Sequence, residues 1–174
     1  TEPLDFRLLL MMPTLYRTWG KVRLADMKPW IGKWALEEIY AGALPQGAQD
    51  ATYVINLKLE EVRKMGGVFC VGAVDISKFF DQVVRPLVYT MARQAGMPRH
   101  VLDTYIRYQE ALTIYNTIVG GLGYPYGKRC GLPQGDPLSM MMVAILMRTW
   151  VAKAKEEGVE PSLLVDDILS LIHI

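Results

Sequence analysis

Two adjacent acidic residues lie inside an otherwise apolar run, LLVDDIL at 163–169. Burying an unpaired carboxylate is costly, and two neighbouring carboxylates also repel each other. A chain that turns back on itself at Asp166 and Asp167 removes this conflict, because the acids then lie at the tip of a hairpin. A Mg²⁺ ion bound there would neutralise their repulsion. A pair of acids also arises by chance in a chain of this size, so the pair alone does not establish a site.

Another acid follows a short apolar segment, VFCVGAV at 68–74, which is rich in β-branched residues. Such a segment is typical of a central strand that is covered on both faces. Asp75 stands at its end, where carboxylate oxygens are well placed to bind a hard divalent cation. The alternative is an ordinary strand-end turn or a helix cap.

A loop rich in glycine and proline, GLPQGDPLS at 131–139, precedes a long apolar segment. Its composition predicts a tight, irregular backbone just before a helix, with Asp136 as N-cap and Pro137 as the first helical residue. Such a loop can approach a nucleotide or a template base closely, and Gln134 offers both a donor and an acceptor. Taken alone, it is also simply a loop and a helix start.

The rest of the chain predicts helices and one strand pair. After Pro13, Leu15, Trp19 and Val22 recur at helical spacing and predict the apolar face of a first helix. Further elements are expected as helices at 30–41, 51–65 (capped by Asp50), 84–95 and 99–112, and as paired strands around 113–119 and 124–130, joined by GGLG. This order of elements indicates an α+β fold.

Composition describes a globular chain and leaves its partner open. Of the 174 residues 51% are hydrophobic, and the formal net charge of +1 gives no global basic excess, although acids elsewhere can mask a basic cleft. Cys70 and Cys130 suggest neither a disulfide framework nor a four-ligand zinc site, which favours an intracellular compartment, nuclear or cytoplasmic. We find no signal peptide and no membrane span. The chain opens without an initiator Met and stops soon after the paired acids, so we expect a fragment.

Together, the three motifs resemble the palm of reverse transcriptases, particularly those of non-LTR retrotransposons and group II introns. Two upstream segments are similar to the fingers segment of the non-LTR group, RPISLLPTLYR, and to the helix that the family places before the palm. The matching stretches are VGAVDISKFFDQV at 71–83 (first palm motif), GLPQGDPLSM at 131–140 (PQG motif), LLVDD at 163–167 (Tyr-x-Asp-Asp box), FRLLLMMPTLYRTWGKVR at 6–23 and ATYVINLKLEEV at 51–62.

The resemblance implies a polymerase palm, with a small antiparallel sheet and helices packed on one face, together with helical fingers and no thumb. The implied parts are fingers at 1–67, palm at 68–83 and 136–168, and a fingers–palm connection at 84–135. The closing LSLIHI at 169–174 does not continue the family pattern. The codons CTG-TCT-CTT-ATA-CAC-ATC would encode it and match the mosaic end of a transposase-made sequencing library. We therefore predict a non-native tail, which the coding DNA can test.

The resemblance also assigns roles to individual residues. Asp75, Asp166 and Asp167 are implied as catalytic acids that bind two Mg²⁺ ions, or Mn²⁺, and Ile76 joins the metal-binding set. Phe80 would lie under the sugar and exclude a 2′-hydroxyl, although it could equally be a core residue.

The remaining nucleotide contacts are implied on both sides of the palm. Arg7 would grip the triphosphate, with a surface arginine as the alternative. Gln134 and Gly135 would lie against the incoming nucleotide. Six basic residues could line the template–primer path without being assigned to it: Arg17, Lys21, Arg23, Lys78, Lys128 and Arg129.

Three residues depart from the family pattern. Leu8 replaces the proline after the fingers arginine, and Leu164 replaces the aromatic residue of the paired-acid box. Asp136 stands where a small residue is more common, and it is expected to add negative charge near the nucleotide, which Lys128 or Arg129 could offset.

The implied function is that of a reverse transcriptase fragment, which transfers a nucleotide from a dNTP to a primer 3′-hydroxyl. Its partners would be an RNA template and a DNA primer, with no membrane and with the oligomeric state open. Group II intron or retron-type enzymes share the three motifs, and Phe80 disfavours an RNA-dependent RNA polymerase. A catalytically inactive nucleic-acid-binding remnant is the alternative from another class, against which the intact acids argue. We expect the isolated fragment to extend primers poorly.

Overall fold

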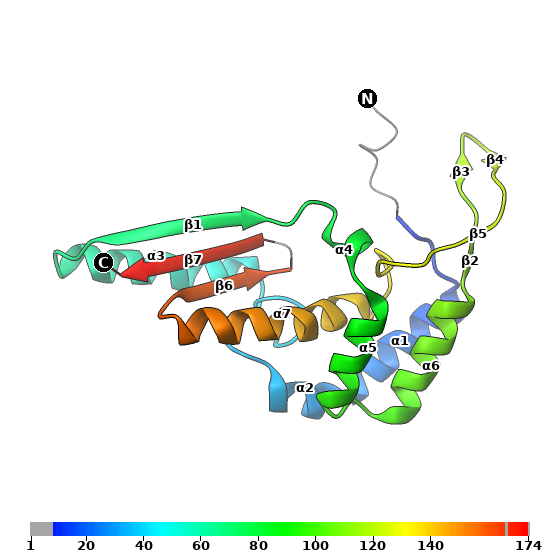
Figure 1. Cartoon of the computed structure of the whole chain (residues 1–174), viewed down its shortest axis with the longest axis horizontal. Coiled ribbons are helices and arrows are strands. Elements are labelled where there is room, and N and C mark those ends of the chain that lie inside the picture. Colours follow the sequence, from blue (N-terminus) through cyan, green and yellow to red (C-terminus); the bar gives the residue numbers. More distant parts are fainter. Residues whose placement is uncertain (1–8, 166, 174) are drawn as a thin grey trace.

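A computed structural model describes residues 9–165 and 167–173. This part of the chain forms seven helices and seven strands, which confirms the predicted α+β class (Figure 1). The helices are α1 (Thr14–Asp26), α2 (Lys28–Trp34), α3 (Ala48–Lys64), α4 (Phe79–Gln82), α5 (Arg85–Gln94), α6 (Arg99–Ala111) and α7 (Ser139–Glu156). None of the helices described is both long and apolar enough to cross a membrane.

The main sheet has three antiparallel strands in the order β1-β7-β6. They are β1 (Phe69–Asp75), β6 (Glu160–Leu164) and β7 (Asp167–His173). β6 and β7 form the hairpin expected from the apolar run around the paired acids, and β1 lies along the other edge of β7. Residues 169–173, which the sequence predicts to be non-native, form most of β7.

β1 is an edge strand, and the expectation of a strand covered on both faces is wrong. In the described part of the chain β1 pairs with β7 alone. Its residues Val71 and Val74 are 44% and 57% exposed. Apolar, β-branched composition reports the tendency to form a strand, but it does not report how many neighbours that strand has in the folded sheet.

Two helices flank the sheet. α7 packs against β6, whose Leu163 is buried together with Ile168 of β7 in the main hydrophobic core. α3 also contacts β6, and Lys58 of α3 forms an ion pair with Glu160 at 2.7 Å. Side chains alternate between the two faces of a strand. Leu163 therefore faces α7, whereas Glu160, Ser162 and Leu164 face α3.

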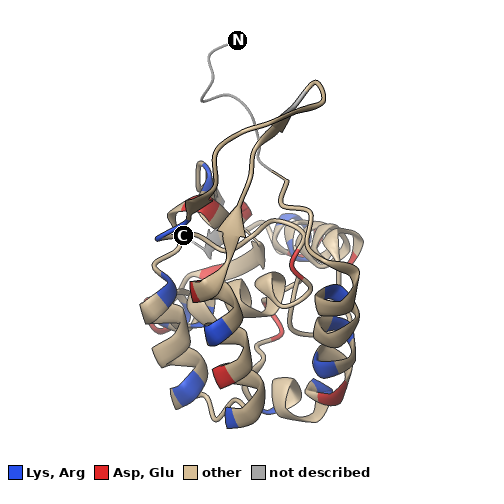
Figure 2. Ribbon diagram, turned by 90° about the vertical axis from the view of Figure 1, so that its right-hand side faces the viewer, with Lys and Arg blue, Asp and Glu red and all other residues tan. Residues whose placement is uncertain are grey.

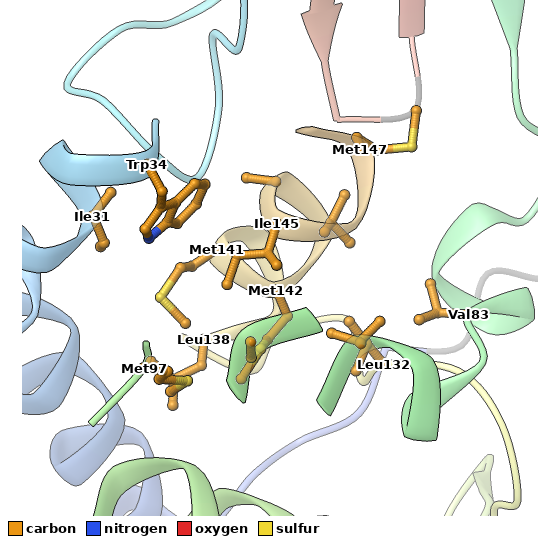
Figure 3. Packing of buried hydrophobic residues seen from close by; sticks show 14 of the residues in the cluster. Ile31, Trp34, Val83, Met97, Leu132, Leu138, Met141, Met142, Ile145 and Met147 are labelled. Carbon is orange, nitrogen blue, oxygen red and sulfur yellow. The ribbon is translucent and has the colours of Figure 1, made fainter. Parts of the chain in front are cut away.

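The core surrounds α7, an almost entirely apolar helix in its first three turns, as expected for a helix buried on most sides. Figure 3 shows Met141, Met142, Ile145 and Met147 of α7 packed between residues of α2 on one side and the α5 region on the other. The labelled cluster comprises Ile31, Trp34, Val83, Met97, Leu132, Leu138, Met141, Met142, Ile145 and Met147.

The buried face of α1 differs from the predicted one. Leu15 and Val22, expected on the apolar face, are 84% and 49% exposed, whereas Tyr16 and Gly20 are buried. The Tyr16 hydroxyl donates a hydrogen bond to a buried carboxylate, and the missing side chain of Gly20 lets another segment approach closely. A polar contact and a small residue therefore determine which face is buried.

Several helix boundaries also differ from the sequence prediction. α2 ends at Trp34, because the following residues pair with the sheet: the Tyr40 N–H donates to the Leu163 carbonyl at 2.8 Å. α3 begins at Ala48 and takes Gly47 as its N-cap, so Asp50 is not the cap residue. Asp50 instead accepts a hydrogen bond from the Gly47 N–H at 2.8 Å, which satisfies a free donor of the first turn.

The predicted strand pair after α6 is confirmed as a hairpin that projects away from the helices (Figure 1). It contains β2 (Thr113–Ile114) paired with β5 (Tyr126–Gly127), and β3 (Thr117–Ile118) paired with β4 (Gly121–Leu122). β4 lies inside the segment that was expected to be the connecting loop, because the chain already reverses at Val119 and Gly120.

Candidate active site

Asp75 and Asp167 lie directly opposite each other on neighbouring strands. Asp75 is the last residue of β1, Asp167 is the first of β7, and the two are partners in the antiparallel register. The Cα atoms of opposite residues in such a pair are about 4.5–5.5 Å apart, and their side chains share one face. Both residues are exposed. The structure therefore brings together two acids that the sequence places far apart.

Asp166 and Arg7 lie outside the described residues, so two of the three predicted acids have a described position. Before Asp166, Val165 has a φ of +62°. Positive φ is rare for a β-branched residue, and such strained positions persist where the surrounding structure imposes them and are concentrated at functional sites. This strain lies at the reversal between β6 and β7, beside the acid pair.

A cavity of about 410 Å³ lies between α3 and the face of the sheet that carries the two acids. Thr52 and Ser162 contribute to its wall, and the Thr52 hydroxyl donates a hydrogen bond to the Ala48 carbonyl at 2.8 Å. Among the described residues that line it, none is Lys, Arg or His, so the two carboxylates have no cationic partner in the cavity. The lining is Ala48, Ala51, Thr52, Ile55, Ala73, Val74, Asp75, Ser162, Leu164, Asp167, Ile168 and Leu169.

A hard divalent cation takes carboxylate, hydroxyl and carbonyl oxygens as ligands, and the described wall of this cavity offers two carboxylates, those of Asp75 and Asp167. Within 9–165 and 167–173, no group of three or more His, Cys, Asp or Glu side chains is placed to hold a metal ion. The Ile76 side chain is hydrocarbon and packs against the core, so the backbone carbonyl oxygen is the ligand atom that Ile76 offers. That oxygen accepts a hydrogen bond from the Phe79 N–H at 3.2 Å.

The glycine- and proline-rich loop crosses directly over the segment that follows Asp75. The Leu132 N–H donates to the Phe80 carbonyl at 2.7 Å, and the Gly131 N–H donates to the Val83 carbonyl at 2.8 Å. Gly131 has a φ of +82°, and a Cβ there would lie 2.8 Å from the carbonyl oxygens of Phe80 and Asp81. A glycine is therefore required at the crossing, which places two of the sequence motifs side by side.

The residues expected to face the nucleotide lie around this crossing. Phe80 is half-buried and meets the Phe79 ring edge-on at 6.2 Å. The Gln134 side chain is also half-buried, and the Gln134 backbone carbonyl accepts a hydrogen bond from the Leu10 N–H at 3.2 Å. Gly135 is exposed, with a φ of +106°. The loop thus touches the chain segment that follows the predicted fingers arginine.

The expectation that Asp136 caps α7 is wrong, and its carboxylate does not face solvent. Its side chain is buried, with 4% exposure, and it precedes the observed N-cap of α7, Leu138. One carboxylate oxygen accepts hydrogen bonds from the Tyr16 hydroxyl at 3.1 Å and from Gln109 Nε2 at 2.5 Å, and the other accepts one from the Leu138 N–H at 3.0 Å. Burial raises the pKa of Asp136 above its usual range.

Lys128, which was expected to offset the charge of Asp136, instead forms an ion pair with Asp81. Arg23 pairs with Asp26 on α1. Figure 2 shows Lys and Arg on several helices.

Sequence reasoning missed the polar residues that hold the loop in place. Gln109 is buried in α6, and buried Arg85 donates to the carbonyls of Gln109 and Lys128. No motif indicates these roles. A buried glutamine on the apolar face of α6 is visible only as an interruption of the helical pattern.

No protein-family model matches this sequence, and no curated protein matches it either. Solved structures do match, and telomerases are among them. Apo telomerase from Candida tropicalis truncated from its C-terminal domain has a TM-score of 0.56 at 13% identity over 91% of this chain and 34% of that chain. The apo telomerase from Candida tropicalis has a TM-score of 0.56 at 12% identity, over 91% of this chain and 30% of that chain.

The telomerase from Candida albicans, solved in complex with the TWJ fragment of telomeric RNA, gives a TM-score of 0.53 at 13% identity over 91% of this chain and 29% of that one. At such low identity the likeness concerns the fold alone, and the chain spans about a third of the length of these telomerases. The likeness shows that this chain shares the fold of part of these telomerases.

Proposed function

We propose that this chain is the fingers–palm part of an RNA-directed DNA polymerase of the non-LTR retroelement type. The observation that carries the proposal is the register pairing of Asp75 with Asp167 at the end of the palm-like sheet. A structural role for two exposed acids does not require them to be opposite each other, where their repulsion is unfavourable. A role in holding cations requires the carboxylates to lie close together, which this pairing achieves.

Asp75 and Asp167 would hold the metal ions, together with Asp166 from the same motif. Two bound Mg²⁺ ions would lower the pKa of a primer 3′-hydroxyl and stabilise the leaving pyrophosphate. The protein's own contribution is to fix the acids on two paired strands, so that the oxygens are held in place before the substrates bind. The cavity beside α3 leaves the acids accessible.

Phe80 and the Gln134–Gly135 turn would orient the incoming dNTP. The backbone hydrogen bond between Leu132 and Phe80 fixes the Phe80 backbone relative to the loop, and the ring packs edge-on against Phe79. A ring held in this way excludes a 2′-hydroxyl by its volume and so favours deoxyribonucleotides. An RNA template and a DNA primer are the partners we propose, and the complex of a telomerase with telomeric RNA supports a nucleic-acid partner for the fold.

Two alternative functions predict different roles for the acid pair or for the flanking sequence. An intron-type or retron-type reverse transcriptase shares the three motifs and would use the same acids. A non-catalytic remnant that binds nucleic acid would need the fold but not the acid pair. The acids therefore separate the remnant from the enzymes, whereas the identity of the element needs the flanking coding sequence.

The test is binding of Mn²⁺, which substitutes for Mg²⁺ at oxygen sites and is followed by the EPR signal of the free ion. We expect the purified chain to bind Mn²⁺, and we expect Asp75→Asn and Asp167→Asn each to weaken the affinity by about tenfold or more, which corresponds to about 1.4 kcal/mol. Asp103→Asn is the matched control, because Asp103 is a surface acid of α6 that pairs with Arg99.

A second measurement connects the metal to the substrate. Binding of dTTP should require Mg²⁺ or Mn²⁺ and should be lost in Asp75→Asn. Equal Mn²⁺ affinity in Asp75→Asn, Asp167→Asn and Asp103→Asn would contradict the proposed metal site. Metal-independent binding of nucleic acid without any binding of dTTP would favour the non-catalytic remnant.

A further inference from the structure

Three of the contacts between the segment 10–20 and the loop 134–137 follow the same order along both segments. Two of them come from the buried face of α1, where the contacting residues are one helical turn apart. The contacts are Leu10 N–H to the Gln134 carbonyl at 3.2 Å, the Tyr16 hydroxyl to Asp136 at 3.1 Å, and Gly20 against Pro137, where a Cβ would lie 3.3 Å from the ring.

Asp136 is the central residue of this interface. Its carboxylate is buried where α1, α6 and the loop meet, and it accepts hydrogen bonds from Tyr16, Gln109 and the Leu138 N–H. The Tyr16 ring also stacks on Tyr108 of α6, with centroids 3.7 Å apart and an angle of 9° between the planes. A buried carboxylate is costly unless its hydrogen bonds are satisfied, so these partners specify one arrangement of the three segments.

We infer that Asp136 is a positioning residue, whose carboxylate fixes the Gln134–Gly135 turn against α1 so that the loop and the fingers segment meet the incoming nucleotide as one unit. This inference rests on the proposed function, in which that turn lies against the nucleotide. It assigns Tyr16 and Gln109 a function through Asp136, and it explains why α1 buries a tyrosine hydroxyl and a glycine instead of Leu15 and Val22.

The inference separates nucleotide binding from metal binding. Asp136, which follows the turn, accepts one hydrogen bond from the Tyr16 hydroxyl of α1 and another from the Leu138 N–H just before α7. The turn is thereby held between α1 and the start of α7. The metal-binding acids lie on β1 and β7, whose pairing does not involve these residues. Loss of the Asp136 contacts should therefore weaken dNTP binding and leave the affinity for Mn²⁺ unchanged.

The experiment measures Mg²⁺-dependent dTTP binding by calorimetry and Mn²⁺ binding by EPR for the same set of variants. Tyr16→Phe removes one oxygen atom and keeps the ring stack, and Asp136→Asn keeps the shape of the side chain. Tyr89→Phe is the matched control, because Tyr89 is an equally buried tyrosine whose hydroxyl donates to a carboxylate, Glu110, at 3.0 Å outside this interface.

We expect Tyr16→Phe and Asp136→Asn each to weaken dTTP binding about tenfold or more, since hydrogen bonds to a charged group are the stronger ones. The variant with both substitutions should bind dTTP no more weakly than the single variant with the lower dTTP affinity, because both changes remove the same contact. Tyr89→Phe should bind dTTP like the unchanged chain, and all four variants should keep its Mn²⁺ affinity. A purely structural role would not produce this split.

Several results would overturn the inference. Unchanged dTTP affinity in Tyr16→Phe would do so even where Asp136→Asn fails to fold, since the tyrosine variant alone breaks the contact. Equal weakening by Tyr89→Phe would show a general loss of stability. A fall in Mn²⁺ affinity in either interface variant would show that the palm itself is disturbed. If the unchanged chain binds Mn²⁺ but no dTTP, or neither, the proposed function fails and the inference fails with it.

Discussion

Replacement of Gly131 by alanine tests whether the loop really crosses the first motif. Gly131 has a φ of +82°, and a Cβ there would lie 2.8 Å from the carbonyl oxygens of Phe80 and Asp81. Both obstacles are backbone atoms, which cannot move aside as a flexible side chain can. Gly120 offers a matched control, because its φ is +80° and a Cβ there would meet nothing within 4 Å.

The difference between the two variants isolates the crossing. An alanine in the left-handed region costs about 1–2 kcal/mol, and this cost applies at both positions. The additional overlap with backbone at Gly131 costs about 1–3 kcal/mol more, by analogy with an overfilled core. Gly131→Ala should therefore lower the free energy of unfolding by about 2–5 kcal/mol, and Gly120→Ala by about 1–2 kcal/mol.

Urea unfolding followed by tryptophan fluorescence measures both values, with the unfolding slope compared to verify that the same surface is exposed. Tryptophans lie at 19, 30, 34 and 150, in α1, α2 and α7, so the signal reports on the core next to the crossing. Equal destabilisation by the two substitutions would refute the close approach of the loop to Phe80, and with it the placement of the two motifs side by side.

Three other predictions follow from the same contacts. Burial raises the pKa of Asp136 above 3.8, so between the two pKa values the folded chain holds a proton that the unfolded chain loses. The unfolding free energy of the unchanged chain, compared with that of Asp136→Asn, should therefore decrease as pH rises through the raised pKa. If urea unfolding shows that this difference increases with pH, the prediction is contradicted. Phe80→Val should narrow the preference for dTTP over UTP about tenfold or more in competitive binding, and an unchanged ratio would remove the steric role of Phe80. Leu163→Ala should cost about 2–5 kcal/mol of unfolding free energy because this residue is 1% exposed, whereas Leu122→Ala, at a 69% exposed site, should cost far less; similar losses in thermal unfolding would place Leu163 outside the core.

The sequence predicted those features that depend on neighbours in the chain. The hairpin around the paired acids, the helices on either side of Gly96, and the strand ending at Asp75 all appear in the structure. Each is encoded locally, by a turn, a helix terminator or a short β-branched run. Local patterns failed for α1, where Tyr16 outweighs the apolar spacing, and for β1, whose sequence does not report its place at the edge of the sheet.

Asp136 illustrates the same limit within the candidate site. Its position before a proline predicted a helix cap near the nucleotide, and its partner Tyr16 is 120 residues away in the chain. No local rule connects a tyrosine in one helix with an acid in a distant loop. A wrong role therefore followed from a correct description of the loop.

The amino-acid sequence by itself determined where strands end and begin, and hence that Asp75 lies at the end of β1 and Asp167 at the start of β7. The tertiary structure alone decided that Asp75 and Asp167 are partners across β1 and β7, and that Asp136 turns inward to Tyr16. The physical reason is range: hydrophobic period and turn chemistry act over a few residues, whereas strand register and buried hydrogen bonds arise only when distant segments pack together.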